Sequence, residues 1–287
     1  MYLLYSVLSS TVIFIVFKSF SKFGINRLQA IIVNYAVACA AGLMLYERPI
    51  AFGQIPDQPW FIGALGLGVL FILIFNLMAL TTQRSGIAVV SVATKMSVVI
   101  PILFGVFYYK DQLGPLKLLG IILALIAVYL ASLKQKDGIQ LKKENLIFPI
   151  LVFLGSGLID TGIKFLEDGY ITKNDVPLFS ALIFATAFTV GISILLIKCV
   201  TGKFQFRWKN VLAGIALGVP NYFSIYFLVQ ALRNGWESST VFLINNVGVV
   251  VFSTLVAILF FKEKIRIKNW IGLLLAVLGI ILVGISS

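Results

Sequence analysis

Hydrophobic runs of about 20 residues recur along the whole chain, and short polar or charged stretches separate them. A helical run of that length crosses a bilayer core of roughly 30 Å. Because lipid offers the backbone no hydrogen-bond partner, each span is expected to be an α-helix. The sequence thus predicts an all-α polytopic membrane protein with ten transmembrane helices, at residues 2–17, 29–46, 59–80, 86–109, 115–133, 146–166, 177–198, 210–232, 238–261 and 267–285.

The composition leaves no room for a soluble domain. Of the 287 residues, 60% are hydrophobic and 12% are charged, and the mean hydropathy is +1.04, which is far from the values of soluble domains. Cys39 and Cys199 fall within or at the end of apolar spans, where buried free thiols are expected. The chain has no histidine, which excludes an imidazole base or ligand. No metal or other cofactor is predicted.

The distribution of the net charge of +12 is typical of membrane topology and not of nucleic-acid binding. Loops after the first, third, fifth, seventh and ninth spans carry sixteen basic residues, whereas the opposite loops carry six. Basic residues accumulate in cytoplasmic loops. The count therefore predicts that both termini lie outside, in a cell (inner) membrane of the bacterial type.

A shift of 152 residues aligns the chain with itself without gaps over residues 60–132, with sixteen identities in 73 positions. The interpretation is a five-helix unit present twice, with a first repeat at 1–134, a connecting loop at 135–144 and a second repeat at 145–287. Because five is odd, the second repeat is inverted, an arrangement that places a substrate site near the membrane midplane and permits alternating access. The alternative is that apolar helices resemble each other by composition alone.

The recurring segment has a polar or glycine entry, a long helix with a central break, an aromatic end and then Lys-Asp or Lys-Glu. Its first copy reads SGIAVVSVATKMSVVIPILFGVFYYKDQL, followed by KLLGIILALIAVYLAS. Together with the ten spans and the inverted repeat, it resembles the drug/metabolite transporter superfamily, EamA-type branch, over the whole chain. The stretch FKSFSKFGINRLQ is similar to the end of the first helix of the small multidrug resistance proteins.

The resemblance implies a pocket lined by the first, third, fourth, sixth, eighth and ninth spans, with the fifth and tenth at the periphery. Small multidrug resistance proteins carry a glutamate eight residues before a lysine that matches Lys18. That position is Ser10 here, and the equivalent before Lys164 is Ser156. The family carboxylate that exchanges protons against cationic drugs is therefore missing. Family members also commonly keep their termini cytoplasmic, in conflict with the charge count.

Lys95 lies near the middle of the otherwise uncharged run 87–109. At 1.5 Å per residue, about 12 Å of hydrocarbon separates it from either interface, roughly twice the reach of a lysine stem. A charge at that depth costs at least about 3 kcal/mol. Lys95 therefore either contacts an anionic substrate group, such as a carboxylate or phosphate, or pairs with Asp160 across the bundle and fixes helix packing. The two roles are not exclusive.

Asp160 is the second charge placed well inside a span. Ser156, Asp160 and Lys164 recur at four-residue spacings on one helical face. One interpretation is an ion pair between Asp160 and Lys164 near a helix end. The other is a proton or cation carrier that couples transport, in place of the missing family carboxylate.

The ninth span carries a polar stripe, in which Ser239, Asn246 and Ser253 recur every seven residues with Asn245 adjacent. Under the shift of 152, Asn246 matches Thr94, so the fourth and ninth spans would present related faces to a common axis. The alternative is a set of interhelical hydrogen bonds worth about 0.6 kcal/mol each.

Pro220 predicts a break in the eighth span, which would free backbone groups that line a cavity or are satisfied by neighbours. The following Asn221 and Tyr222 are then candidate pocket residues. The complete set of candidate substrate-binding residues is Lys95, Thr94, Ser91, Asp160, Ser10, Ser156, Asn221, Tyr222, Asn245 and Asn246.

These features favour a secondary-active transporter of a small organic metabolite, with an anionic or zwitterionic solute such as an amino acid as substrate. The alternatives are a proton-coupled exporter of cationic metabolites or drugs, and a non-transporting membrane receptor or scaffold. No phosphate-binding glycine loop is present, and one buried lysine with one buried aspartate does not make an enzyme site. The expected partners are a small molecule and membrane lipid, without nucleic acid. The oligomeric state stays open, and a monomer is compatible with the sequence.

Overall fold

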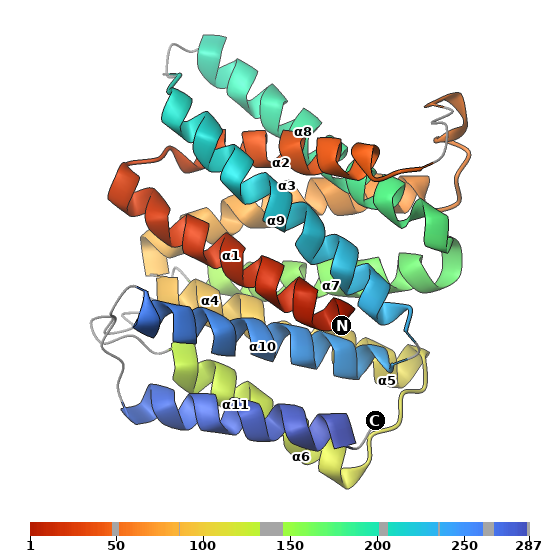
Figure 1. Ribbon diagram of the computed structural model, residues 1–287, viewed down its shortest axis with the longest axis vertical. Helices are drawn as coiled ribbons and strands as arrows, with labels where there is room; N and C mark the ends of the chain where they lie inside the picture. The colour runs from red at the N-terminus through yellow and green to blue at the C-terminus, as the bar shows by residue number, and fades with distance from the viewer. Residues whose placement is uncertain are drawn as a thin grey trace. The chain divides into compact units, whose positions relative to one another are not determined.

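The computed structural model describes residues 1–47, 52–85, 87–132, 146–200, 206–234, 236–260 and 267–285 (Figure 1). Within these ranges the chain is all-helical and has no strand. Two 3₁₀ helices, Phe52–Gln54 and Lys173–Asp175, precede α3 and α8. The α-helices are α1 (Tyr2–Phe23), α2 (Arg27–Met44), α3 (Phe61–Ser85), α4 (Ile87–Met96), α5 (Val99–Tyr108), α6 (Pro115–Ser132), α7 (Ile147–Tyr170), α8 (Val176–Val200), α9 (Trp208–Leu232), α10 (Ser238–Leu259) and α11 (Ile267–Ile285).

Each of the ten predicted spans contains a helix, and the fourth contains two, α4 and α5. Seven helical segments of the described chain are long and apolar enough to cross a membrane. Three shorter apolar segments, Tyr2–Phe17, Val92–Tyr108 and Pro115–Leu130, occupy the first, fourth and fifth predicted spans. The predicted all-helical, polytopic class is therefore confirmed, while the ten-span inverted repeat stays a prediction.

The fourth span breaks between α4 and α5. In a continuous helix the Ser97 carbonyl would accept from residue 101, but Pro101 has no N–H. This carbonyl accepts instead from the N–H of Ile100 at 2.9 Å, and the Ser97 hydroxyl donates to the Thr94 carbonyl at 2.6 Å. The ninth span is the unbroken helix α10, because Ser253, which aligns with Pro101, keeps its N–H. The central break predicted for the recurring segment is therefore present in the fourth span, and the prediction is wrong for the ninth span.

The break predicted at Pro220 is wrong, because α9 runs through this proline without interruption. A proline in a helix leaves the carbonyl four residues earlier without its usual donor. Side-chain donors support the backbone of α9 just after the proline. The Ser224 hydroxyl donates to the Asn221 carbonyl at 2.8 Å, and the Ser6 hydroxyl of α1 donates to the Ser224 carbonyl at 2.9 Å.

The chain divides into two compact units, unit 1 (residues 1–72 and 165–230) and unit 2 (residues 73–164 and 231–287). In unit 1, α2 packs along α8. The helix α9 also approaches α2 closely, because Gly218 leaves space for Val37 and for the Asn34 carbonyl. The amide of Asn221 donates to the Asn34 side chain at 3.0 Å. Glycine contacts and amide pairs of this kind are typical of helix packing in membranes.

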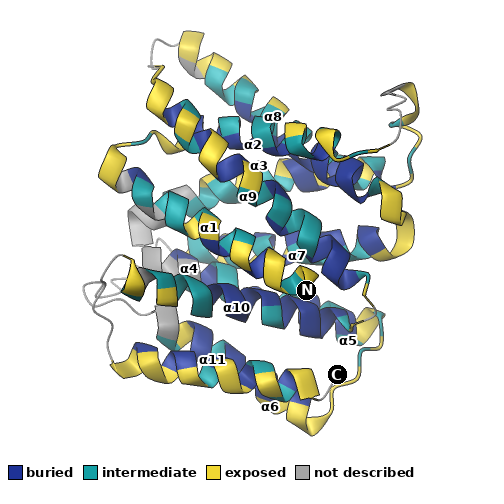
Figure 2. Cartoon of the chain, in the orientation of Figure 1, coloured by how far each residue is buried: buried dark blue, intermediate teal, exposed yellow. Residues whose placement is uncertain are grey.

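In unit 2, α6 and α11 lie side by side as the most closely packed helix pair (Figure 1). Gly120 and Gly279 face each other at their contact, and a Cβ at Gly279 would lie 2.9 Å from the Gly120 carbonyl oxygen. The Asn269 amide donates to the Leu130 carbonyl at 3.0 Å. The outer faces of both helices carry exposed residues (Figure 2), such as Leu274 at 62% exposure, as contact with lipid requires. The helix α10 packs against α5, α6 and α11.

We expect Gly279→Ala to lower the thermal unfolding midpoint of the purified protein, because the added methyl group forces α6 and α11 apart at a cost of about 1–3 kcal/mol. The matched control is Gly284→Ala on the same helix, where a Cβ would meet nothing within 4 Å. Both changes replace glycine by alanine, which favours the helix by up to about 1 kcal/mol, so a loss of stability confined to Gly279→Ala reports the contact. Equal midpoints for the two variants would contradict the close packing.

Candidate functional site

Three polar side chains from three helices of unit 2 interact with one another: Lys95 of α4, Asp160 of α7 and Asn246 of α10. The Lys95 ammonium donates to Oδ1 of Asn246 at 3.3 Å. The Asp160 carboxylate accepts a hydrogen bond from the Asn246 side chain and interacts electrostatically with Lys95. We call these three residues the polar trio. The Asn246 amide interacts with both the Lys95 ammonium and the Asp160 carboxylate, so each charged group has a hydrogen-bond partner.

The amide of Asn246 is held in one orientation. Its oxygen accepts from Lys95, and its nitrogen donates to the Phe242 carbonyl at 3.2 Å. An asparagine amide has two N–H donors, and the second is thus available for Asp160. Asn246 is only 7% exposed, whereas Lys95 and Asp160 are half-buried. The buried amide therefore positions two charged groups that remain partly accessible.

The break in the fourth span sets the position of Lys95. Because α4 ends at Met96, Lys95 lies in the last turn of a half-length helix. A cation at a helix C-terminus is stabilised by the partial negative charge of the last carbonyl groups. Discontinuous helices of this kind supply ion and substrate sites in membrane transporters. The same proline that interrupts the helix thus places a helix end next to the polar trio.

Lys95 and Asp160 interact electrostatically, as the packing role expected from the sequence requires, and this role of the pair stays a prediction. Removing either group would leave the other as a lone charge in a membrane-spanning segment, which is costly. Lys164, the other partner considered for Asp160, lies with its ammonium 5.2 Å from the ring centroid of Tyr109. The groups that act on Asp160 are Lys95 and Asn246. The role of Lys95 toward a substrate stays a prediction.

Sequence reasoning missed that Asn246 joins Lys95 to Asp160. It placed Asn246 on a polar stripe of the ninth span, and its alignment with Thr94 was the signal that this face lies toward the helix of Lys95. Other predicted residues lie in unit 2 as well. The Thr94 hydroxyl donates to the Val90 carbonyl of its own helix at 2.8 Å, Ser156 is half-buried one turn before Asp160, and Asn245 is buried. The side chain of Ser91 lies outside the described residues.

The remaining predicted residues belong to unit 1. Ser10 is half-buried on α1, and Asn221 of α9 donates to Asn34. Tyr222 is fully buried, and within the described part of the chain its hydroxyl has no hydrogen-bond partner. A buried hydroxyl without a partner costs about 1–3 kcal/mol. Tyr222 is thus the predicted residue of unit 1 whose polar group is least satisfied.

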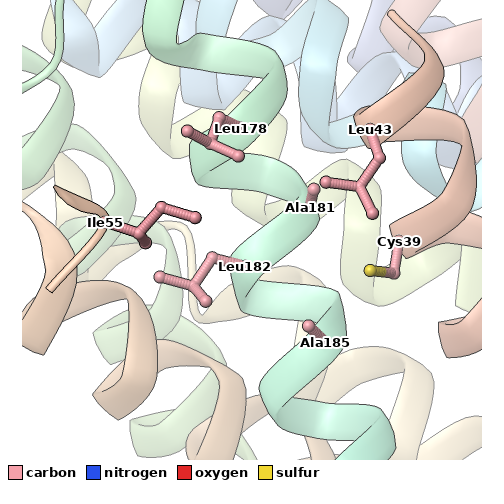
Figure 3. A pocket seen from close by; sticks show the side chains of 7 residues that line it. All are labelled: Cys39, Leu43, Ile55, Leu178, Ala181, Leu182 and Ala185. Carbon is pink, nitrogen blue, oxygen red and sulfur yellow. The ribbon is translucent and has the colours of Figure 1, made fainter. Parts of the chain in front are cut away.

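Unit 1 also contains a cavity of about 170 Å³ between α2 and α8 (Figure 3). Its lining is almost wholly apolar, and the Cys39 thiol is its most polar group. A lining of this kind offers no charged or amide group to orient a metabolite. The residues are Cys39, Leu43, Ile55, Leu178, Ala181, Leu182 and Ala185. We therefore assign the candidate solute site to the polar trio and not to this cavity.

We expect Lys95→Met and Asp160→Leu each to lower the thermal unfolding midpoint, because each leaves one charge unpaired. The double variant should be more stable than the sum of the two losses predicts, by at least about 1 kcal/mol. The control uses Lys173→Met in place of Lys95→Met. Lys173 is exposed and belongs to unit 1, so the stability losses of Lys173→Met and Asp160→Leu should be additive. Additive losses for Lys95 and Asp160 would show that their charges are not coupled.

Comparison with known proteins agrees with this architecture. The sequence profile of the EamA-like transporter family matches residues 1–133 and 145–285. An uncharacterized protein of Haemophilus influenzae is 28% identical over 287 residues, covering 97% of this chain and 95% of that protein. A solved crystal structure, 14% identical in sequence, has the same fold, with a TM-score of 0.80 over 100% of this chain and 96% of the other. Since the profile covers nearly the whole sequence, this chain belongs to the EamA-like transporter family.

Proposed function

We propose that this multi-pass membrane protein is a secondary-active transporter of a small zwitterionic or anionic metabolite, such as an amino acid, that works by alternating access. Family membership supports a membrane transporter. The observation that favours this substrate class is the polar trio, in which the ammonium of Lys95 and the carboxylate of Asp160 share one amide. The substrate would bind where these two charges meet.

A zwitterion matches a paired cation and anion. Its carboxylate replaces Asp160 as the partner of Lys95, and its ammonium replaces Lys95 as the partner of Asp160. After both exchanges each charge again faces an opposite charge, so no charge is left unpaired inside the membrane once the substrate is bound. The neutral Asn246 amide can form hydrogen bonds in the site with and without substrate, because it both donates and accepts hydrogen bonds.

The pairing also weighs against an exporter of cationic drugs. A lipophilic cation would bind Asp160 only by displacing Lys95, and it brings no anion to stabilise the displaced ammonium. That exchange leaves a net positive charge at the site, which a low-dielectric environment disfavours. A simple anion would pair with Lys95 and leave a net negative charge at Asp160, unless a proton enters with the anion. A zwitterion, or an anion that enters together with a proton, therefore fits the site best.

We expect Lys95→Gln to abolish transport while leaving the protein folded. The first measurement is a thermal-shift screen of the purified protein against amino acids, nucleosides, nucleotide sugars and cationic dyes. A ligand at 100 times its Kd adds about 2.7 kcal/mol of stability, and this gain should be present in wild type and in the Lys173→Gln control but lost in Lys95→Gln. The second is uptake of the stabilising ligand into proteoliposomes. Full uptake by Lys95→Gln, or stabilisation by cationic dyes alone, would reject the proposal.

Asp160 is the proposed coupling residue. For an anionic substrate, a proton that binds Asp160 removes its charge and releases Lys95 for the incoming carboxylate, so protonation and substrate binding are linked. If the ligand found in the screen is an anion, we expect Asp160→Asn to bind it but to lose accumulation driven by an imposed pH gradient. A zwitterion needs the ionised Asp160 as the partner of its ammonium, so Asp160→Asn should also weaken its binding. The measurement compares counterflow, which needs no gradient, with pH-driven uptake in the same proteoliposomes. Wild-type pH-driven accumulation in Asp160→Asn would exclude this role.

A further inference from the structure

A second cluster of charged side chains in unit 2 lies outside the polar trio, where the turn between α5 and α6 meets the start of α10. The Asp111 carboxylate accepts hydrogen bonds from the Ser238 hydroxyl and from the Ser239 N–H, both at 3.1 Å. It thus satisfies backbone and side-chain donors in the first turn of α10. A carboxylate at this end of a helix also interacts favourably with the helix dipole.

Glu237, the residue that precedes α10, contacts the turn between α5 and α6 and the start of α6. Its Oε1 accepts from the backbone N–H of Gln112 at 3.2 Å, and its Oε2 forms an ion pair with Lys117 of α6. The Lys117 side chain is fully buried, whereas the Glu237 side chain is 32% exposed. Charge-assisted hydrogen bonds are about twice as strong as neutral ones. We call Asp111, Glu237 and Lys117 the carboxylate clamp.

The backbone of the turn is built to present Asp111. Lys110 has a φ of 60°, the left-handed conformation in which helices commonly end. The N–H groups of Tyr109 and Asp111 both donate to the Gly105 carbonyl, at 3.0 and 3.1 Å. A Cβ at Gly105 would lie 2.6 Å from Asp111 Oδ2 and 2.8 Å from the Ser238 hydroxyl. Gly105 is thus the residue of α5 that leaves room for the clamp.

The same turn reaches the helices that carry the polar trio. Through Tyr109 it contacts Lys164, one helical turn after Asp160 on α7. Through Asp111 it holds the first turn of α10, which carries Asn246 eight residues further on, about 12 Å along the helix. It directly continues α5, which follows the helix of Lys95. One turn of the chain is therefore connected to all three helices of the site.

We propose that Asp111 and Glu237 are positioning residues for transport, which fix the position of α10 along its axis against α5 and α6 and so hold the Asn246 amide between Lys95 and Asp160. The Lys95–Asn246 hydrogen bond is already 3.3 Å long. Slippage of α10 by one residue, about 1.5 Å, would break it. The geometric part of the proposal, that the clamp positions α10, does not depend on the proposed function. The transport part, that this positioning is needed for transport, rests on the proposed function.

The test of the geometric part uses spin labels in a chain whose two native cysteines are replaced by alanine. The labels are attached at Leu119→Cys on α6 and Leu259→Cys on α10, which are 48% and 71% exposed. We expect Asp111→Ala to shift or broaden the inter-label distance distribution by at least about 1.5 Å, one residue of helix rise. Asp111→Asn keeps an acceptor oxygen for Ser238 and should retain the wild-type distribution.

Gly105→Ala provides a second route to the same loss, should Asp111→Ala fail to fold. It displaces the Asp111 carboxylate although alanine is the better helix former. Its matched control is Gly114→Ala at the end of the same turn, where a Cβ would meet nothing within 4 Å. Wild-type distances in Gly105→Ala, or in folded Asp111→Ala, would overturn the proposal.

The transport part is measured as uptake of the ligand from the thermal-shift screen. Asp111→Ala and Gly105→Ala should lose about tenfold in uptake, equivalent to about 1.4 kcal/mol, while Asp111→Asn and Gly114→Ala retain it. Altered distances with wild-type uptake would overturn the positioning role in transport. If the wild-type protein transports none of the ligands, the proposed function fails, and altered distances in the two variants would still support the clamp as the group that positions α10.

Discussion

Hydrocarbon cannot satisfy a polar group, and the structure of this chain depends on that constraint at every level. The backbone meets this constraint by forming helices in every predicted span. Polar side chains within the helices form hydrogen bonds with one another, as Asn221 and Asn34 do in unit 1. The two deep charges, Lys95 and Asp160, meet the constraint through each other and through Asn246. A solute bound at the proposed site would have to provide new partners for the charges that it separates, and this requirement is the physical basis for proposing a substrate with both a positive and a negative group.

One proline creates the asymmetry between the aligned segments of the chain. Pro101 interrupts the fourth span and leaves Lys95 at the end of a short helix, whereas Ser253 at the aligned position allows α10 to continue. The broken helix supplies the cation, and the continuous helix supplies the neutral amide that orients it. A continuous helix needs to be held in register along its whole length. The clamp at its first turn provides that restraint, through carboxylates that the lipid could not replace.

Much of the fold followed from patterns that a sequence shows directly. Apolar length predicted a helix in each of ten segments, and the pattern of the recurring segment predicted the interruption within the fourth. The depth of Lys95 and Asp160 marked them as candidate site residues, because burial of a charge is expensive wherever the chain folds. The same reasoning failed at Pro220, where α9 continues, since a proline removes only one backbone hydrogen bond and the rest of the helix can persist. The repeat placed Asn246 on a face related to that of the Lys95 helix but did not identify the hydrogen bond to Lys95, and Asp111 carried no signal that identified its partners.

The sequence by itself determined that this protein is helical, spans a membrane and carries two charges that need partners, because hydropathy and charge act on each residue independently of its neighbours in space. It also carried the family resemblance that the profile match confirms. Only the tertiary structure decided that Lys95 and Asp160 share the amide of Asn246, that Lys164 lies over Tyr109, and that a turn after α5 holds the start of α10. These contacts join residues up to about 150 positions apart, and the choice among such partners depends on packing geometry at distances of a few ångströms, which no periodicity along the chain encodes.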